Sequence, residues 1–130
     1  MRVLHLTLKK KWFDMIASDE KKEEYREVKM FWAARFLHGF SKSELSLNLG
    51  DLKSAYKTRF GETVLDAVKK NFDAVKFTNG YAKNAPTITL EFKDISIGKA
   101  KPEWSDNWQG DVFIIKLGNI IEHPKNNQTK

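Results

Sequence analysis

The residues with the clearest capacity for chemistry are Lys21, Glu24 and Arg26, which lie close together in one polar stretch. If residues 23–28 form a strand, Glu24 and Arg26 share a face and lie about 6–7 Å apart. If Val28 on that face points to the core, both charges line the mouth of a barrel, and Lys21 enters from the preceding turn. Arg offers a planar fork, Lys a point charge, and Glu an acceptor for exocyclic amines, so the trio suits phosphates and base edges. Spacing alone also allows a solvated strand with ion pairs worth under about 1 kcal/mol.

This stretch resembles the signature of the ASCH domain family, Gly-x-Lys-x-x-Glu-x-Arg, which it matches at Lys21, Glu24 and Arg26. The surrounding order is also similar, with a short strand and a helix before the motif and a strand-rich second half. The resemblance covers residues 1–36 and 72–122, and it is to the small, stand-alone members found in bacteria and phages. It implies a PUA-like β-barrel with a cleft beside the first helix, and a role in RNA or nucleoside recognition.

Two positions depart from the family pattern. The signature glycine is Asp19 here, at a helix end where a left-handed conformation suits glycine better than aspartate. The branch of the family that hydrolyses the amide of N4-acetylcytidine has Thr where this chain has Glu24, so its proposed hydroxyl nucleophile is missing. If the chain is an enzyme, Lys21 would act as a base once desolvation lowers its pKa, and Glu24 would orient water. Ribonuclease activity, proposed for other family members, is the further catalytic alternative.

Several residues outside the motif are candidates for contacts with nucleic acid. In a turn-forming loop, Tyr81 is expected to stack on a base, while Asn79 and Lys83 reach base edges or phosphate. Hairpin geometry explains the same loop without any ligand. Trp104 in a polar loop is either a lid over the cleft or a plug over the core. Lys9 lies at the beginning of the first predicted helix, where it contacts phosphate or is simply solvated.

Hydrophobic periodicity predicts the elements that position these residues. Alternation of Leu4, Leu6 and Leu8 predicts an opening strand, and spacing of three and four residues predicts helices from Trp12 and over 33–40. Three further strands are expected around 75–77, 88–97 and 112–117. A phase slip at Lys93–Asp94 predicts a β-bulge. Phe31 and Trp32, directly after the motif strand, are expected in the core.

These elements predict an α+β fold, a PUA-like bent β-barrel with flanking helices, formed as a single domain over residues 1–122. Residues 41–71 are interpreted as a helical insertion of two short helices. One would carry an apolar stripe of Leu52, Ala55, Tyr56 and Phe60, and the other a stripe of Val64, Leu65 and Val68. Residues 123–130 are expected to form a flexible tail.

Composition narrows the classes further. The 130 residues include 23 basic and 17 acidic side chains, giving a net charge of +6, and there is no cysteine. This excludes a disulfide framework and thiolate catalysis, and a mild positive charge helps a polyanion approach. His5, His38 and His123 lack metal-type spacing, so no metal and no cofactor are expected. Apolar runs are too short for a membrane span, and we expect a cytoplasmic monomer without a membrane partner.

The sequence therefore predicts a protein that recognises RNA, a nucleoside or a nucleotide through a cleft lined by Lys21, Glu24 and Arg26. Lys9, Asn79, Tyr81, Lys83 and Trp104 complete the predicted binding set. The alternative is a small hydrolase, either an amidohydrolase acting on an acylated pyrimidine nucleoside or a ribonuclease-like enzyme. In that case Lys21 and Glu24 would be its catalytic residues. An open groove would suit RNA and a closed pocket would suit a nucleoside.

Overall fold

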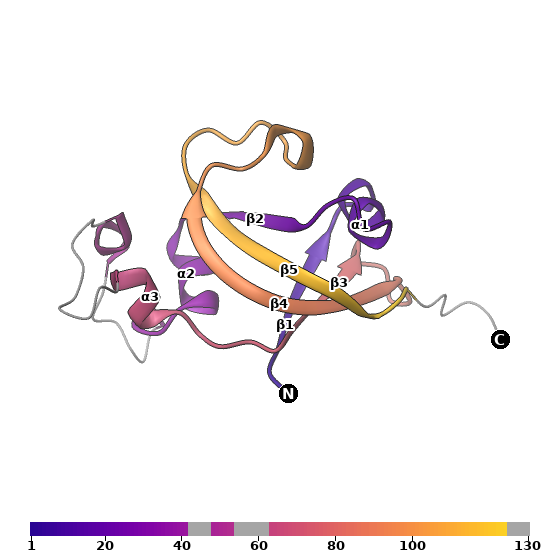
Figure 1. The fold of residues 1–130 in the computed structure, drawn as a ribbon, viewed down its shortest axis with the longest axis horizontal. Coiled ribbons are helices and arrows are strands. Elements are labelled where there is room, and N and C mark those ends of the chain that lie inside the picture. The colour runs from indigo at the N-terminus through magenta and orange to yellow at the C-terminus, as the bar shows by residue number, and fades with distance from the viewer. Residues whose placement is uncertain (42–47, 54–62, 125–130) are drawn as a thin grey trace.

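One strongly curled sheet and a few short helices make up the computed structural model, which describes residues 1–41, 48–53 and 63–124 (Figure 1). The elements follow one another as β1 (Val3–Leu8), α1 (Lys10–Ala17), β2 (Glu23–Glu27), α2 (Met30–Phe36), a 3-10 helix (Leu49–Lys53), α3 (Val64–Val68), β3 (Ala74–Asn79), β4 (Thr87–Gly98), a second 3-10 helix (Pro102–Trp104) and β5 (Val112–Glu122). Helices and strands are mixed along the chain, so the predicted α+β class is confirmed.

The sheet has the order β1-β3-β4-β5-β2, with β1 parallel to β3 and the other pairs antiparallel. The two edge strands, β1 and β2, come early in the sequence and lie at opposite ends of this order. Curling brings them close enough for Arg26 on β2 to donate to the carbonyl oxygen of Thr7 on β1 at 2.9 Å. The sheet is therefore a half-barrel whose two edges meet across a side-chain seam.

The long strands β4 and β5 provide the curl. Their register shifts between Thr89 and Leu90, between Leu90 and Phe92, and between Phe92 and Asp94. Each shift sharpens the bend and twist of a strand pair. The last of them spans the predicted bulge at Lys93–Asp94, which is thus confirmed. The apolar run from Val112 to Leu117 pairs with β4 on one side and β2 on the other, as expected for a central strand.

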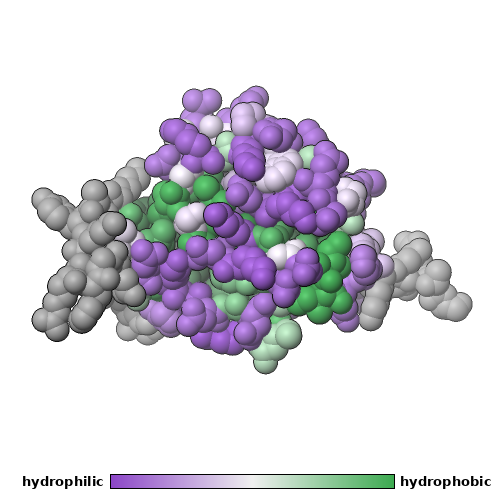
Figure 2. Space-filling model, viewed as in Figure 1, coloured by the Kyte–Doolittle hydropathy of each residue, from purple (hydrophilic) through white to green (hydrophobic). Residues whose placement is uncertain are grey.

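The core fills the inside of the half-barrel. Leu4, Leu6 and Leu8 of β1 pack there with the apolar side of α1, as the alternation predicted. Tyr25 points the other way and forms a smaller buried cluster with Val112 and Ile114. The outer surface in the same view carries mostly hydrophilic side chains, interrupted by apolar patches (Figure 2). No helix within the described ranges is long and apolar enough to cross a membrane.

Two expectations about the region after the motif need correction. The second helix begins at Met30 and ends at Phe36, three residues earlier than predicted at its start, and Gly39 has a φ of 91° beyond its end. Phe31 is not in the core: 60% of its surface is exposed. Only one face of this short helix packs against the core. That face carries Ala33 and Phe36, and Phe31 lies outside it.

The predicted insertion over 41–71 is described only in part. Leu52 in the 3-10 helix and Leu65 in α3 are buried, and both pack against the main core. Thr63 caps α3, because its hydroxyl accepts from the Asp66 backbone N–H and the Asp66 carboxylate accepts from the Thr63 N–H. The predicted stripe residues Ala55, Tyr56 and Phe60 lie outside the described residues, as does most of the predicted tail, 125–130.

Candidate functional site

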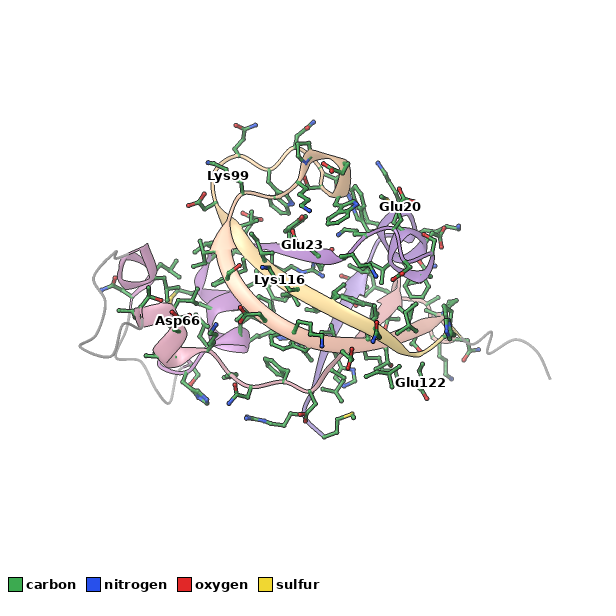
Figure 3. All side chains as sticks on the ribbon, viewed as in Figure 1. Glu20, Glu23, Asp66, Lys99, Lys116 and Glu122 are labelled. Carbon is green, nitrogen blue, oxygen red and sulfur yellow. The ribbon has the colours of Figure 1, made fainter. Side chains whose placement is uncertain are left out.

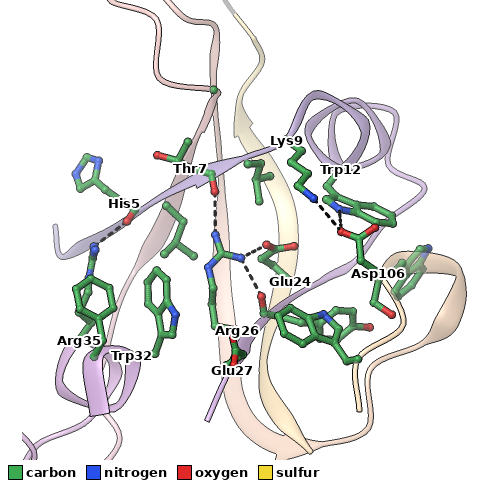
Figure 4. A pocket seen from close by; sticks show the side chains of 18 of the residues that line it. His5, Thr7, Lys9, Trp12, Glu24, Arg26, Glu27, Trp32, Arg35 and Asp106 are labelled. Carbon is green, nitrogen blue, oxygen red and sulfur yellow. Dashed lines mark hydrogen bonds and ion pairs between the residues drawn. The ribbon is translucent and has the colours of Figure 1, made fainter. Parts of the chain in front are cut away.

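A pocket of about 950 Å³ lies in the seam between β1 and β2 (Figure 4). Its walls come from both edge strands, the start of α1, the outer face of α2, the β3–β4 loop and the loop between β4 and β5. The site thus occupies the place where one more strand pairing would have closed the barrel.

The turn after α1 positions the first motif residue. Ser18 ends the helix and Asp19 follows with a φ of 69°, the left-handed conformation expected there. The backbone N–H groups of Glu20 and Lys21 then both donate to the carbonyl oxygen of Met15, at 2.9 and 3.0 Å. This tight reversal directs the Lys21 side chain back beneath the helix, where it is 1% exposed.

Strand pairing explains why Glu24 and Arg26 point into the pocket. Glu24 lies opposite Ile115 and Arg26 opposite Phe113, and both partners are fully buried residues of β5 inside the half-barrel. Directly paired residues share a face of the sheet, so the two charged side chains face inward as predicted. Tyr25 lies between them and faces the opposite side.

The three motif residues form one ion cluster. Lys21 donates to one carboxylate oxygen of Glu24, and Arg26 donates to the other. The side chains of Lys21 and Glu24 are 1% and 6% exposed, and that of Arg26 is 14% exposed. Two cations therefore share a single buried carboxylate, and the cluster has one positive charge more than it has negative charges.

Lys21 lies behind Glu24 and is not part of the pocket wall. Its ammonium nitrogen is 5.1 Å from the ring centroids of both Trp12 and Tyr25, so aromatic surface covers it. Burial lowers the pKa of Lys21 by more than the Glu24 carboxylate raises it, and the nearby Arg26 charge lowers it further. Lys21 thus orients Glu24 from within the protein.

Arg26 crosses the seam. One of its terminal nitrogens donates to Glu24 and to the carbonyl oxygen of Tyr25, and the other donates to Thr7 at 2.9 Å. Its guanidinium carbon is 5.0 Å from the ring centroid of Trp32. In the described part of the chain these bonds use three of the five guanidinium N–H groups, which leaves donors for a ligand.

Aromatic residues make up much of the pocket wall. All four tryptophans of the chain line it, together with Tyr25, Phe31 and Tyr81. Tyr81 is 93% exposed and Phe31 is 60% exposed, so rings at the rim stand in solvent beside the opening. Isolated rings of this size are normally buried against a core. Their grouping around one opening is the kind of exposed patch that marks a binding site.

Asp106 tethers the loop after β4 to the start of α1. Its carboxylate accepts from the ammonium of Lys9 and from the indole N–H of Trp12, both at 3.4 Å. This contact lies at one end of the pocket and Arg35 lies at the other (Figure 4). Trp104 and Trp108 belong to the same loop and are carried to the pocket with it.

Most of the predicted site is brought together. Glu24, Arg26, Lys9, Tyr81 and Trp104 all line the pocket. Lys21 is not among the lining residues and lies behind Glu24, Trp12 and Tyr25, so its position does not support the expectation that it contacts a ligand directly. Asn79 and Lys83 are outside the pocket wall: Asn79 ends β3, and the exposed Lys83 lies past the turn.

Sequence reasoning missed other lining residues, among them Trp12, Tyr25, Arg35, Asp106 and Trp108. A helical signal was available for one of them, because Arg35 follows Phe31 by four residues and shares its exposed helix face. Asp106 had no such signal, since its partners Trp12 on α1 and Lys9 just before it are 94 and 97 residues away.

Within the described residues, no group of three His, Asp or Glu side chains is placed to hold a metal ion. No protein-family model matches the chain, and no curated protein or solved structure does. The fold and the site define it as a small α+β protein with a curled five-stranded half-barrel and an aromatic pocket in the barrel seam.

Proposed function

We propose that the protein binds a nucleobase in the seam pocket, as part of a nucleoside, a nucleotide or an unpaired RNA residue. The observation that carries this proposal is a buried carboxylate, held by two cations, in a pocket lined by seven aromatic residues. Nucleobases combine a flat π-face with a polar edge, and this wall offers a matching surface for each.

Glu24 and Arg26 supply the polar part of the proposed recognition. A carboxylate can accept about four hydrogen bonds, and the cluster uses one from Lys21 and one from Arg26. The remaining acceptor positions suit an exocyclic amine, and one of the two unused N–H groups of Arg26 suits a ring nitrogen or carbonyl oxygen beside that amine. The neighbouring acceptor and donor thus match the alternating edge of a base.

The aromatic rings supply the stacking surface. Stacking of a base on an aromatic side chain contributes about 1–3 kcal/mol, and it is tolerant of base identity. Tyr81, which contributes little to the core, is the simplest such platform. The motif that resembles the ASCH signature agrees with this assignment, and a PUA-like barrel and an RNA or nucleotide partner belong to the same proposal.

The tryptophans allow a direct test. Titration with nucleosides, nucleotides and short single-stranded RNA should change the intrinsic tryptophan fluorescence, because all four indoles line the pocket. Tyr81→Ala should weaken binding about 5- to 100-fold. Ile121→Ala is the matched control, an exposed apolar residue outside the pocket that should bind as the native chain does. Absence of binding by any of these ligands would overturn the proposal.

A hydrolase acting on an acylated pyrimidine nucleoside, or a ribonuclease, is the second candidate. The observation in its favour is the lowered pKa of Lys21, because a lysine acts as a base only when its amine loses its proton. Glu24 separates Lys21 from the pocket, so Glu24 would have to orient the attacking water. Turnover of N4-acetylcytidine or cleavage of RNA above the level of a Lys21→Ala variant would support this candidate, and equal rates would remove it.

A further inference from the structure

Arg26 and Arg35 form a pair of guanidinium groups on one wall of the pocket. Their guanidinium carbons lie 5.0 and 5.6 Å from the ring centroid of Trp32, which is drawn between them in Figure 4. Both also donate to the exposed edge of β1, Arg26 to Thr7 at 2.9 Å and Arg35 to His5 at 2.8 Å. The indole and the strand edge together hold the two cations in place.

The strand sets the spacing of this arginine pair. His5 and Thr7 are two residues apart on β1, so their carbonyl oxygens are about 6–7 Å apart along the strand edge. The two guanidinium groups that bond them are therefore held along the same strand edge, one on each side of Trp32. A phosphate group over the rim of the indole would accept a charge-assisted hydrogen bond from each side.

Positive charge is in excess near Arg26 and Arg35. Lys9 is paired with Asp106, and Lys29 with Glu27 at 3.9 Å. Glu24 is shared by Lys21 and Arg26, which leaves one positive charge in excess. Arg35 adds another, because within the described residues its guanidinium bonds only a backbone carbonyl and lies against an indole. This excess positive charge, part of it buried as Lys21 behind Glu24, favours a phosphate monoester, which carries a charge of about −1.5 to −2 near neutral pH.

We propose that Arg26 and Arg35 form a phosphate subsite, so that the preferred ligand of the pocket is a nucleotide and not a bare nucleoside. This inference rests on the proposed function, because it takes the base to be held at Glu24. The phosphate then lies beside Trp32, at the end of the pocket away from Lys9 and Asp106. The same chemistry fits the terminal phosphate of a mononucleotide and the phosphodiester of RNA, and the test separates these two sources.

The test compares ligands that differ only in phosphate. Tryptophan fluorescence would be titrated with a nucleoside, its 5′- and 3′-monophosphates, a dinucleotide and inorganic phosphate alone, at two salt concentrations. We expect a monophosphate to bind at least about 10-fold more tightly than the nucleoside, with an advantage that shrinks in high salt. A dinucleotide that binds as tightly as the best monophosphate would identify RNA as the source. A dinucleotide that binds like the nucleoside would identify the mononucleotide.

The variants separate the subsite from general charge effects. Arg35→Gln should remove most of the affinity advantage of the monophosphate over the nucleoside. Arg35→Lys should keep part of that advantage, because Lys retains the charge but lacks the planar fork. Arg2→Gln is the matched control, an exposed arginine outside the pocket wall, and it should keep the full advantage.

The outcomes distinguish the phosphate subsite from base recognition. If nucleosides bind and phosphate adds nothing, or if Arg35→Gln keeps the advantage, the phosphate subsite is wrong while base recognition stands. If inorganic phosphate competes and Arg35→Gln abolishes that competition, but no base contributes to affinity, the subsite stands and the proposed function fails. If neither nucleosides nor phosphate bind, both are wrong.

Discussion

Two lysines of this chain are held by carboxylates in opposite surroundings. Lys21 is 1% exposed and bonds Glu24 in the pocket floor. Lys69, at the end of α3, bonds Asp66 at 3.2 Å and Asp94 at 2.8 Å, and these carboxylates are 43% and 46% exposed. Figure 3 shows Asp66 at the opposite end of the molecule from Glu20, which belongs to the turn before Lys21. The first pair builds a site, and the second joins α3 to the sheet.

Burial decides which way each pair shifts its lysine. At Lys21, desolvation lowers the pKa and outweighs the attraction of Glu24. At Lys69, desolvation acts in the same direction, but the hydrogen bonds and charges of Asp94 and Asp66 outweigh it and raise the pKa. The carboxylates favour the charged lysine in both places, and the burial of Lys21 is what turns the net shift downward. The buried Lys21 fixes the position of the Glu24 carboxylate. The exposed interaction of Lys69 with Asp94 stabilises the contact between α3 and β4.

The largest expected effect comes from removing the buried carboxylate. Glu24→Ala leaves Lys21 and Arg26 buried next to each other without a counter-charge, which should lower the free energy of unfolding by about 3–5 kcal/mol. Asp94→Ala removes a carboxylate from the exposed pair and should cost under about 1 kcal/mol. Urea denaturation of both variants measures the difference. Equal losses would mean that the Glu24 cluster is far more solvated than its exposed fractions indicate.

Replacing Lys21 by Met should cost less than replacing Glu24, about 1–2 kcal/mol, because Glu24 keeps Arg26 as its partner. Its pH dependence is the sharper readout. The folded pKa of Lys21 is below the unfolded value of 10.5, so between these two values the unfolded state binds more protons and stability rises with pH. Lys21→Met should lose this rise. Denaturation midpoints measured at several pH values up to about 10.5 would show it, and a variant that follows the native curve would contradict it.

Lys69 should show the opposite sign. Its folded pKa is above 10.5, so its contribution is present below that pH and is lost as the pH rises through the folded pKa. Lys69→Met should cost under about 1 kcal/mol near neutral pH, since its carboxylate partners are close to half exposed. It should also flatten the alkaline fall in stability. A thermal melt in raised salt supplies the control, because salt should narrow the gap between the variant and the native chain.

The smallest effect is expected at the turn that carries Lys21. Asp19 adopts a φ of 69°, which glycine adopts without strain, so Asp19→Gly should be neutral or stabilising by up to about 1 kcal/mol. The exposed ion pair between Asp19 and Lys22 adds little to oppose this gain. A clear drop in melting temperature would count against the alignment of Asp19 with the signature glycine. Ser18→Gly, one residue earlier at a φ of −83°, is the control and should be destabilising.

Local chemistry made part of this site predictable. The inward face of Glu24 and Arg26 followed from alternation along one strand, and the left-handed Asp19 from the end of one helix. The bulge at Lys93–Asp94 appeared as a phase slip in the apolar pattern.

The remaining features depend on how distant segments meet. Phe31 was assigned to the core because the sequence does not show that α2 borders an open seam, whereas Trp32 packs against the core and also lines the pocket. Asp106 joins the site only because the β4–β5 loop reaches α1. The burial of Lys21 depends on Trp12 and Tyr25 enclosing it from two different elements.

The seam has a consequence for how copies of this chain meet. An uncovered strand edge is a template for pairing with another chain and so for aggregation. On β1 that edge presents the carbonyl oxygens of His5 and Thr7, and the guanidinium groups of Arg35 and Arg26 occupy both. These side chains take the place of a neighbouring strand's N–H donors. The two arginines of the pocket wall thereby also protect the sheet from edge-to-edge self-association.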